Sequence, residues 1–410
     1  MIAATPPVVA PQSQRRPFSV PANRLDALNR ARQLVPRIRG RAARAEAERR
    51  IPDETIRELH DAGLFHLVTP RTFGGAELGF SVLVEVTAEL AAACGSTGWV
   101  YGVLTGHSWM LNLFPAQAQH DVFDDPAALT ATVFRLGGEV RRVEGGYRLT
   151  GGAGRFCSGI DFASWVIVGN AVIAEGGKPE PRFFVVPRSE IEVVDDWFTA
   201  GMRGTGSRSI RIADTFIPQH RSIALQQMLD GTSPGAQFHN TPLYRLPFVH
   251  IAPFSIIGAP LGMARGALAT YSEALTKKLA GAPDLLVAEQ GATLSRLAEV
   301  AAGVDAAYAL VLEDARRVDG VDGGQMLTPL EQARIPRDWA HAAQTSRYAV
   351  TRLFECSGGS GIYDSSELQR VWRDVNSAAQ HVAFTWDTTM TGFGRAMLGL
   401  APAAFSLRGR

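Results

Sequence analysis

Three polar side chains stand out in the sequence because each lies in an apolar or glycine-rich context and could donate or accept a proton. His107 lies in the apolar stretch TGWVYGVLTGHSWMLNLF, His381 lies in NSAAQHVAFTWD, and Ser158 lies in RFCSGID. An imidazole titrates near neutral pH, and a serine hydroxyl both donates and accepts a hydrogen bond. These residue types suit general acid–base catalysis.

Each of these residues also has an ordinary structural interpretation. A lone histidine in a core is usually satisfied by a backbone or carboxylate partner, and a serine before a glycine is common in turns. Trp99 could fill the core of an apolar helix, as most tryptophans do. Cys157 has no histidine paired with it by motif, which disfavours a nucleophilic thiol. Residue types alone leave both interpretations open.

Composition excludes several other classes of protein. The 410 residues carry 41 Lys and Arg against 40 Asp and Glu, and this balance disfavours a nucleic-acid partner. The three cysteines form no CxxC pair, so we expect no metal site and a cytoplasmic location. No apolar stretch reaches the roughly 20 residues that a bilayer requires, so we expect no membrane partner. No GxGxxG follows a predicted strand, so NAD(P)H is not expected in a Rossmann unit.

The elements that must position these residues divide into three domains after a leader. Residues 1–21 predict a loose N-terminal leader, and residues 22–125 predict a helical domain in which Asp53 caps a short helix. Residues 126–235 carry short runs of Val, Ile and Phe bounded by Gly or Pro, typical of strands. Residues 236–410 predict long helices. The predicted fold class is α+β, mostly α, with an antiparallel β-barrel-like domain before a C-terminal four-helix bundle.

This order of elements, with three local motifs, resembles the acyl-CoA dehydrogenase superfamily from about residue 50 to residue 400. The motifs are PRTFGGAEL, DWFTAGMRGTGSRSIRIADTFIP and GGSGIYDSSELQRVWRDV. The resemblance implies a flavin between the β domain and the bundle, and a homotetramer. The family's dehydrogenases carry a catalytic Glu shortly after an Arg-Asp pair. Here Arg373-Asp374 is followed by NSAAQHVAFTWD, which contains no Glu.

A second branch of the superfamily, the oxygenase components of two-component flavin-dependent monooxygenases, resembles this sequence more closely. Such proteins take reduced flavin from a separate NAD(P)H-flavin reductase, form a C4a-hydroperoxyflavin with O2, and hydroxylate a small aromatic or heteroaromatic substrate. The resemblance therefore implies O2 as co-substrate and reduced FMN (FMNH2) as the preferred cofactor, with FADH2 as the alternative.

The resemblance also implies a role for each candidate residue. The Ser158 hydroxyl is expected near flavin N5, His381 is expected to tune or protonate the peroxide, and His107 is expected to act as a base for the substrate. These three residues form the predicted catalytic set. The predicted flavin-binding residues are Trp99, Phe156, Cys157, Ser158, Gly159, Gly359, Ser360 and His381. The predicted substrate-binding residues are His107, Thr132 and Val133.

Two features leave alternatives open. Phenol hydroxylases of this branch often offer a second hydroxyl from the first strand of the β domain, where this sequence has Val133 with Thr132 adjacent. An indole, a polyketide, or a substrate oxidised at nitrogen or sulfur therefore stays open. The loop around Gly359 and Ser360, expected at the flavin phosphate of this or a neighbouring subunit, could equally be a helix–helix turn. An acyl-CoA dehydrogenase-like flavoenzyme with a displaced base and a non-catalytic binding protein remain the competing functions.

Overall fold

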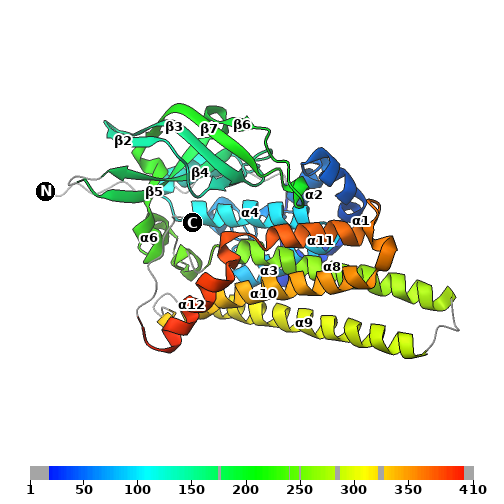
Figure 1. Cartoon of the computed structure of the whole chain (residues 1–410). Coiled ribbons are helices and arrows are strands. Elements are labelled where there is room, and N and C mark those ends of the chain that lie inside the picture. Colours follow the sequence, from blue (N-terminus) through cyan, green and yellow to red (C-terminus); the bar gives the residue numbers. More distant parts are fainter. Residues whose placement is uncertain are drawn as a thin grey trace.

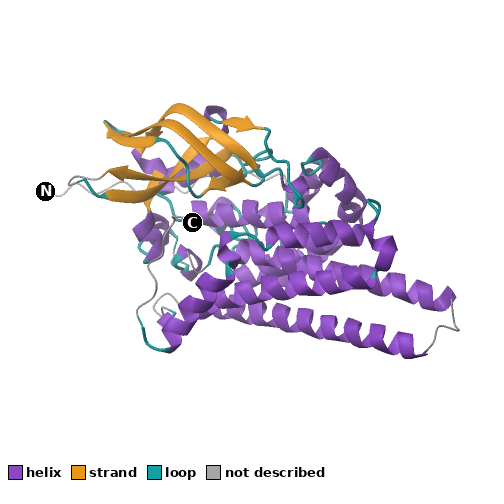
Figure 2. Ribbon diagram, viewed as in Figure 1, coloured by secondary structure: helices purple, strands orange, loops and turns teal. Residues whose placement is uncertain are grey.

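The computed structural model describes residues 18–173, 177–239, 241–248, 251–281, 287–321 and 327–400. The β sheet lies across one end of a set of long helices, and helix α4 runs between the sheet and the bundle (Figures 1 and 2). The predicted loose leader falls mostly on residues 1–17, which lie outside the described residues. Its described end is packed, because the ring of Phe18 stacks on His66 at 4.6 Å between centroids.

The N-terminal domain is helical, as predicted. Its helices are α1 (Arg24–Glu48), α2 (Asp53–Asp61), η1 (Leu64–His66), η2 (Arg71–Phe73), α3 (Phe80–Ala93), α4 (Gly95–Leu111) and α5 (Ala116–Phe123). The prediction that Asp53 caps α2 is wrong by one position, since Pro52 precedes the helix and Asp53 is its first residue. The fixed φ of proline suits a helix entry, and a carboxylate in the first turn interacts favourably with the helix dipole.

Helix α4 is buried along its whole length because glycines let the neighbouring helix approach closely. A Cβ at Gly102 would lie 1.9 Å from the Ser255 carbonyl oxygen, and a Cβ at Gly106 would lie 2.4 Å from the Ser255 Cβ. Ser255 belongs to α8, so a larger residue at either glycine would separate α4 from the bundle. This close packing fixes the positions of the Trp99 and His107 side chains, which α4 carries.

The middle domain is one eight-stranded sheet in the order β6-β7-β3-β2-β4-β5-β8, with β1 paired to β4. The strands are β1 (Thr130–Val133), β2 (Glu139–Val143), β3 (Gly146–Cys157), β4 (Trp165–Ile173), β5 (Pro179–Pro187), β6 (Glu192–Val194), β7 (Arg208–Pro218) and β8 (Ser222–Ala224). Most pairs are antiparallel, but β1 and β2 both run parallel to β4. The predicted antiparallel arrangement therefore holds for most strand pairs but not for these two, because alternation of residue types predicts strands and not their neighbours. The sheet is curved and barrel-like without closing.

The C-terminal domain contains the predicted bundle. Its helices are α8 (Phe254–Gly281), α9 (Val287–Asp319), α10 (Pro329–Cys356), η8 (Gly358–Ile362), α11 (Glu367–Ala378), η9 (Val382–Phe384) and α12 (Trp386–Met397). Helices α11 and α12 are separate because the chain turns at His381, whose side chain caps η9. The segment between β7 and α8 also holds short elements. They are β8, α6 (Leu225–Leu229), α7 (Pro234–Phe238) and η6 (Pro242–Tyr244).

Two absences bear on function within the part of the chain that the structure describes. None of its helices carries an apolar stretch long enough to cross a bilayer. No group of three or more His, Cys, Asp or Glu side chains there is arranged to hold a metal ion.

Candidate functional site

Three of the predicted residues meet where the three domains meet. Trp99 comes from α4, Ser158 directly follows β3, and His381 lies in the turn after α11. The Trp99 Nε1–H donates to the Ser158 Oγ at 3.3 Å. The His381 ring meets the Trp99 ring edge to face, with 5.5 Å between centroids and 66° between planes. The three residues form a continuous contact although up to 282 positions separate them in the sequence.

The Ser158 hydroxyl continues into a chain of buried hydroxyl groups that the sequence analysis missed. Ser158 Oγ lies 2.6 Å from Ser207 Oγ, which lies 2.7 Å from Thr205 Oγ1. The Thr205 hydroxyl donates to the Met202 carbonyl oxygen at 2.8 Å. Thr205 and Ser207 flank Gly206 in the GMRGTGSRS motif. Their hydroxyls were the available signal, but a turn rich in Gly, Ser and Thr does not reveal which hydroxyls become buried.

The chain of hydroxyls is anchored on the C-terminal bundle. Met202 has a left-handed backbone with φ of 55°, and its N–H donates to Asp374 Oδ1 at 2.5 Å. Burial raises the pKa of Asp374 to about 6. The preceding Gly201 lies so close to α11 that a Cβ there would be 2.2 Å from the Arg373 carbonyl oxygen. Because the two backbones are in direct contact, the turn can take only one position against the bundle.

His381 is held as a neutral imidazole with a defined tautomer. Its Nδ1 accepts the Ala383 backbone N–H at 3.2 Å, so the ring proton lies on Nε2. Burial lowers the pKa of His381 to about 4. The sequence-based expectation of a pKa near neutrality is therefore wrong, because desolvation disfavours the imidazolium. At neutral pH, His381 offers an Nε2–H donor beside Trp99.

His107 lies two turns further along α4, about 12 Å from Trp99 by helix rise. Its Nδ1 is 3.2 Å from the Thr130 carbonyl oxygen, which can only accept, so the ring proton lies on Nδ1. Burial lowers the pKa of His107 to about 4. Its ring also meets Phe134 edge to face at 6.3 Å. His107 Nε2 is an acceptor that has no hydrogen-bond partner among the described residues.

The two residues predicted on the first strand differ in what they offer. Thr132 is buried in β1, and its Oγ1 has no hydrogen-bond partner in the described part of the chain. Val133 packs in the sheet, where a Cβ on Gly154 would lie 2.5 Å from its Cγ1. Because an unpaired buried hydroxyl is costly, Thr132 is the better candidate for contact with a polar ligand atom.

The predicted flavin-binding residues around Ser158 fit a flat aromatic ligand. Phe156 has a left-handed backbone with φ of 65° and a side chain that is 69% exposed. Its ring faces Trp197 edge-on at 6.2 Å. Cys157 is fully buried, and burial raises the pKa of its thiol, so it is no nucleophile. Gly159 has a left-handed backbone with φ of 74°, which favours glycine, and a Cβ there would also lie 2.9 Å from the Leu104 side chain.

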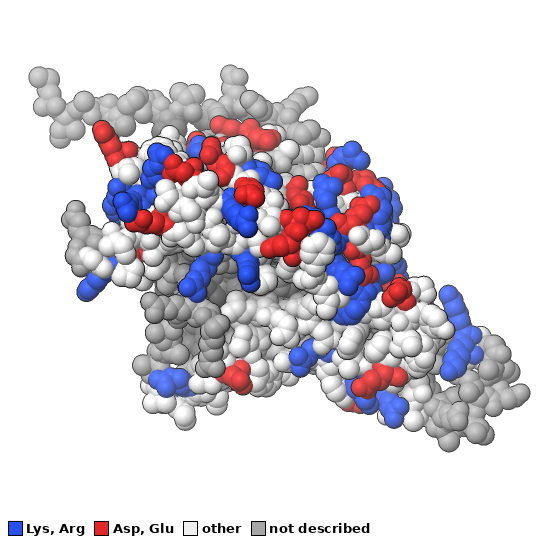
Figure 3. Space-filling view, turned by 45° about the horizontal axis from the view of Figure 1, so that its top comes forward, with Lys and Arg blue, Asp and Glu red and all other residues white. Residues whose placement is uncertain are grey.

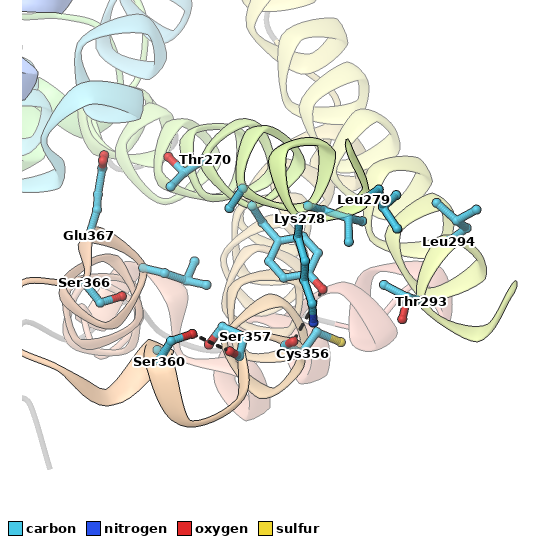
Figure 4. Close-up of a pocket in the computed structure, with 15 residues that line it drawn as sticks. Thr270, Lys278, Leu279, Thr293, Leu294, Cys356, Ser357, Ser360, Ser366 and Glu367 are labelled. Carbon is cyan, nitrogen blue, oxygen red and sulfur yellow. Dashed lines mark hydrogen bonds between the residues drawn. The ribbon is translucent and has the colours of Figure 1, made fainter. Parts of the chain in front are cut away.

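Gly359 and Ser360 are not brought to this cluster. Both lie in η8, and Ser360 lines a separate pocket of about 480 Å³ between α8, α9, the end of α10 and the start of α11 (Figure 4). The Ser360 hydroxyl donates to the Ser357 carbonyl oxygen at 3.0 Å. Lys278 and Glu367 line the same pocket from opposite sides. Within one chain, the loop therefore lines a pocket that none of Trp99, Ser158 and His381 lines.

The cluster beside Ser158 fits a flavin. Trp99 and Phe156 supply aromatic surfaces for a planar heteroaromatic ring. The Ser158 hydroxyl and the His381 Nε2–H supply polar groups at its edge. This combination of aromatic surfaces and polar groups suits a ring system with nitrogen and oxygen atoms along its rim.

Comparison with known proteins places the chain in a family. The model of the acyl-CoA dehydrogenase N-terminal domain matches residues 28–124, and the model of the acyl-CoA dehydrogenase C-terminal domain matches residues 255–386. The oxygenase subunit HsaA, a flavin-dependent monooxygenase of Mycobacterium tuberculosis, is 35% identical over 372 residues, which cover 90% of this chain and 94% of HsaA. The chain belongs to the acyl-CoA dehydrogenase superfamily.

Further relatives define the branch. The oxygenase component of an FADH2-dependent resorcinol hydroxylase from a Rhizobium species is 34% identical, covering 89% of this chain and 92% of that protein. The crystal structure of HsaA from M. tuberculosis superposes with a TM-score of 0.88, covering 93% of this chain and 99% of HsaA at 34% identity. XiaF from a Streptomyces species, solved with FADH2 and glycerol, gives a TM-score of 0.84 at 30% identity, covering 94% and 98%. These relatives confirm the predicted fold and the predicted monooxygenase branch.

Proposed function

We propose that this chain is the oxygenase component of a two-component flavin-dependent monooxygenase and hydroxylates a small aromatic substrate. The observation that carries the proposal is the contact of Trp99, Ser158 and His381 at the junction of the three domains. Relatives that span nearly the whole chain are named as oxygenase components of such systems. No carboxylate lies between Asp374 and Asp387 to act as the α-proton base of a dehydrogenase.

The residues of the cluster have complementary roles in this proposal. Reduced flavin supplies the electrons and activates O2 when it is bound. Trp99 and Phe156 cover the ring and exclude water, which lengthens the life of a reactive oxygen species. The Ser158 hydroxyl would hold the N5 edge of the flavin, and the His381 Nε2–H would donate a hydrogen bond where negative charge develops on oxygen.

The substrate contacts are assigned to His107 and Thr132. Because the pKa of His107 is about 4, its imidazole is too weak a base to remove a phenolic proton completely. Its free Nε2 is instead proposed to accept a hydrogen bond from a substrate hydroxyl, which enriches the ring with electrons. Thr132 Oγ1 is proposed to contact a polar substituent, and Val133 to line the pocket through the sheet.

The proposed partners follow from the two-component scheme. A separate NAD(P)H-flavin reductase supplies reduced flavin. FMNH2 and FADH2 both remain candidates, although the names of two relatives specify FADH2 and so favour it over the initial expectation of FMN. We also propose a cytoplasmic location. A homotetramer is proposed because a group of apolar side chains near the C-terminus is exposed. They are Ile362, Tyr363, Val382, Trp386, Met397 and Leu398.

The test supplies reduced flavin from an unrelated NADH-flavin reductase. Purified protein, FMNH2 or FADH2 and a panel of phenols and indoles are mixed in air, with catalase present. We expect O2 uptake and a product heavier by one oxygen atom only when reduced flavin is supplied. Tightly bound oxidised flavin that an acyl-CoA reduces would instead establish the dehydrogenase alternative.

A further inference from the structure

The hydroxyl chain below Ser158 can be ordered in only one direction. A carbonyl oxygen cannot donate a hydrogen bond, so the Thr205 hydroxyl must donate its only hydrogen to the Met202 carbonyl oxygen. The Ser207 hydroxyl, 2.7 Å from Thr205 Oγ1, must then be the donor in that pair. For the same reason Ser158, 2.6 Å from Ser207 Oγ, must donate to Ser207. The Met202 carbonyl thus sets the direction of three successive hydrogen bonds.

This order decides what Ser158 can offer to a ligand. Its single proton points at Ser207, and one of its two lone pairs accepts the Trp99 Nε1–H. What remains is one lone pair, so toward the ligand Ser158 is a hydrogen-bond acceptor. Reversing this polarity would require two lone pairs to face each other at hydrogen-bond distance, or the Thr205 bond to Met202 to break.

The surroundings favour the fixed order. Thr205 and Ser207 are 3% and 4% exposed, so water is a poor substitute for their partners. The Met202 carbonyl is held in place because its own residue donates to Asp374 Oδ1. The Trp197 Nε1–H also donates to that carbonyl, at 3.1 Å. A buried polar network in which every member is satisfied is rigid.

We propose that Thr205 and Ser207 are positioning residues that make Ser158 an acceptor and thereby select reduced over oxidised flavin. N5 of a reduced flavin carries a hydrogen and can donate to Ser158, whereas N5 of an oxidised flavin carries only a lone pair. The inference rests on the proposed function, because it assumes that flavin N5 lies at Ser158. It adds the two residues that set the preference for the redox state.

The test measures dissociation constants of reduced flavin, under anaerobic conditions, and of oxidised flavin by fluorescence titration. In Thr205→Val and Ser207→Ala, Ser158 regains the freedom to donate to N5. We expect the ratio of the oxidised to the reduced dissociation constant to fall about tenfold in both variants, the scale of one net hydrogen bond. The midpoint potential of the bound flavin should fall by about 30 mV, the equivalent of tenfold for a two-electron couple.

Two controls separate this effect from damage to the fold. Thr205→Ser keeps the hydroxyl and should restore the wild-type ratio. Thr87→Val removes a buried threonine hydroxyl that has no hydrogen-bond partner in the described structure, and it should also keep that ratio. If Thr205→Val fails to fold, Ser207→Ala gives the same reading.

The outcomes distinguish the inference from the proposed function. Tight flavin binding with an unchanged ratio and potential in folded Thr205→Val and Ser207→Ala would overturn the inference and leave the proposed function standing. Failure of the wild-type protein to bind reduced flavin at all would overturn both.

Discussion

The two histidines of the site are fixed by backbone groups in opposite tautomers. The Ala383 N–H donates a hydrogen bond to Nδ1 of His381, whereas the Thr130 carbonyl oxygen accepts one from the Nδ1–H of His107. One ring therefore offers an Nε2–H and the other an Nε2 lone pair. With the pKa of each lowered to about 4, both are neutral at physiological pH and act through hydrogen bonds. Sequence reasoning found both residues, but their protonation depends on burial, which a local pattern does not reveal.

The acceptor role of His107 can be tested with substrate kinetics. His107→Phe keeps a ring of similar size and removes the Nε2 acceptor. We expect the KM of a hydroxylated aromatic substrate to rise about tenfold, the scale of one lost hydrogen bond, while the dissociation constant of reduced flavin stays unchanged. His107→Gln keeps a hydrogen-bond acceptor, so its KM should rise less than that of His107→Phe. Equal KM values for wild type and His107→Phe would show that His107 is only a core residue.

At the scale of elements, the turn before β7 joins the β domain to helix α11. Gly201 contacts the Arg373 backbone, and Met202 donates to Asp374. The glycine has no substitute here, because the nearest atom to a Cβ would be a backbone oxygen that cannot move aside. Sequence motifs identified both segments, and only the fold shows that they touch.

We therefore expect Gly201→Ala to disturb the site indirectly, by moving the turn that positions Met202 and the hydroxyl groups below Ser158. The added Cβ would displace the turn and weaken the hydrogen bond between Met202 and Asp374. We expect a lower thermal midpoint and weaker binding of reduced flavin, measured by differential scanning fluorimetry and titration. Gly392→Ala in α12 is the matched control, since nothing lies within 4 Å of its Cβ. Helix propensity predicts that this control is neutral or stabilising by up to about 1 kcal/mol. Equal effects of the two changes would contradict the assigned contact.

The elements themselves were largely predictable, and their pairing was not. Hydrophobic periodicity located the long helices, and runs of β-branched residues located the strands. The parallel neighbours of β4 were missed because residue alternation does not specify pairing. The break at His381 was missed because neither Gly nor Pro marks it in NSAAQHVAFTWD. Thr205 and Ser207 were missed because their role is to extend a buried row of hydrogen-bonded hydroxyls, which forms only when the turn is folded.

At the scale of the whole molecule, the bundle holds a buried pair of carboxyl groups. Asp314 of α9 and Asp338 of α10 are each 1% exposed. Arg334 Nε lies 3.3 Å from Asp314 and 3.2 Å from Asp338, and Arg337 pairs with Asp338 at 2.6 Å. Burial, and then the neighbouring Asp338, raise the pKa of Asp314 to about 7. The ionised form of Asp314 is therefore a cost to the fold.

This pair predicts a specific dependence of stability on pH. Because the folded pKa of Asp314 is raised, its contribution to stability is present below about pH 4 and is lost as pH rises through about 7. Asp314→Asn cannot ionise. We expect it to match wild type below about pH 4 and to be more stable at pH 8 by at least about 1 kcal/mol, one pKa unit being about 1.4 kcal/mol. Thermal melts across this range give the measurement. A variant that is equally destabilised at both pH values would contradict the assignment.

The surface agrees with the near-neutral composition. On the face seen in Figure 3, basic and acidic side chains are interspersed over the upper part of the molecule and form no extended region of one sign. This distribution gives little long-range attraction for a polyanion, in keeping with the net charge of +1.

The contact between Gly201, Met202 and Asp374 also constrains how the protein can be recombined. Met202 and Asp374 lie 172 positions apart and on different domains, yet the Met202 backbone N–H donates a hydrogen bond to the Asp374 carboxylate. A chimera that takes its C-terminal bundle from a relative would keep the orientation of the Met202 carbonyl only if that bundle brings an acceptor at the position of Asp374. Inheritance of this pair as a unit, rather than overall identity, should decide which chimeras retain an intact site.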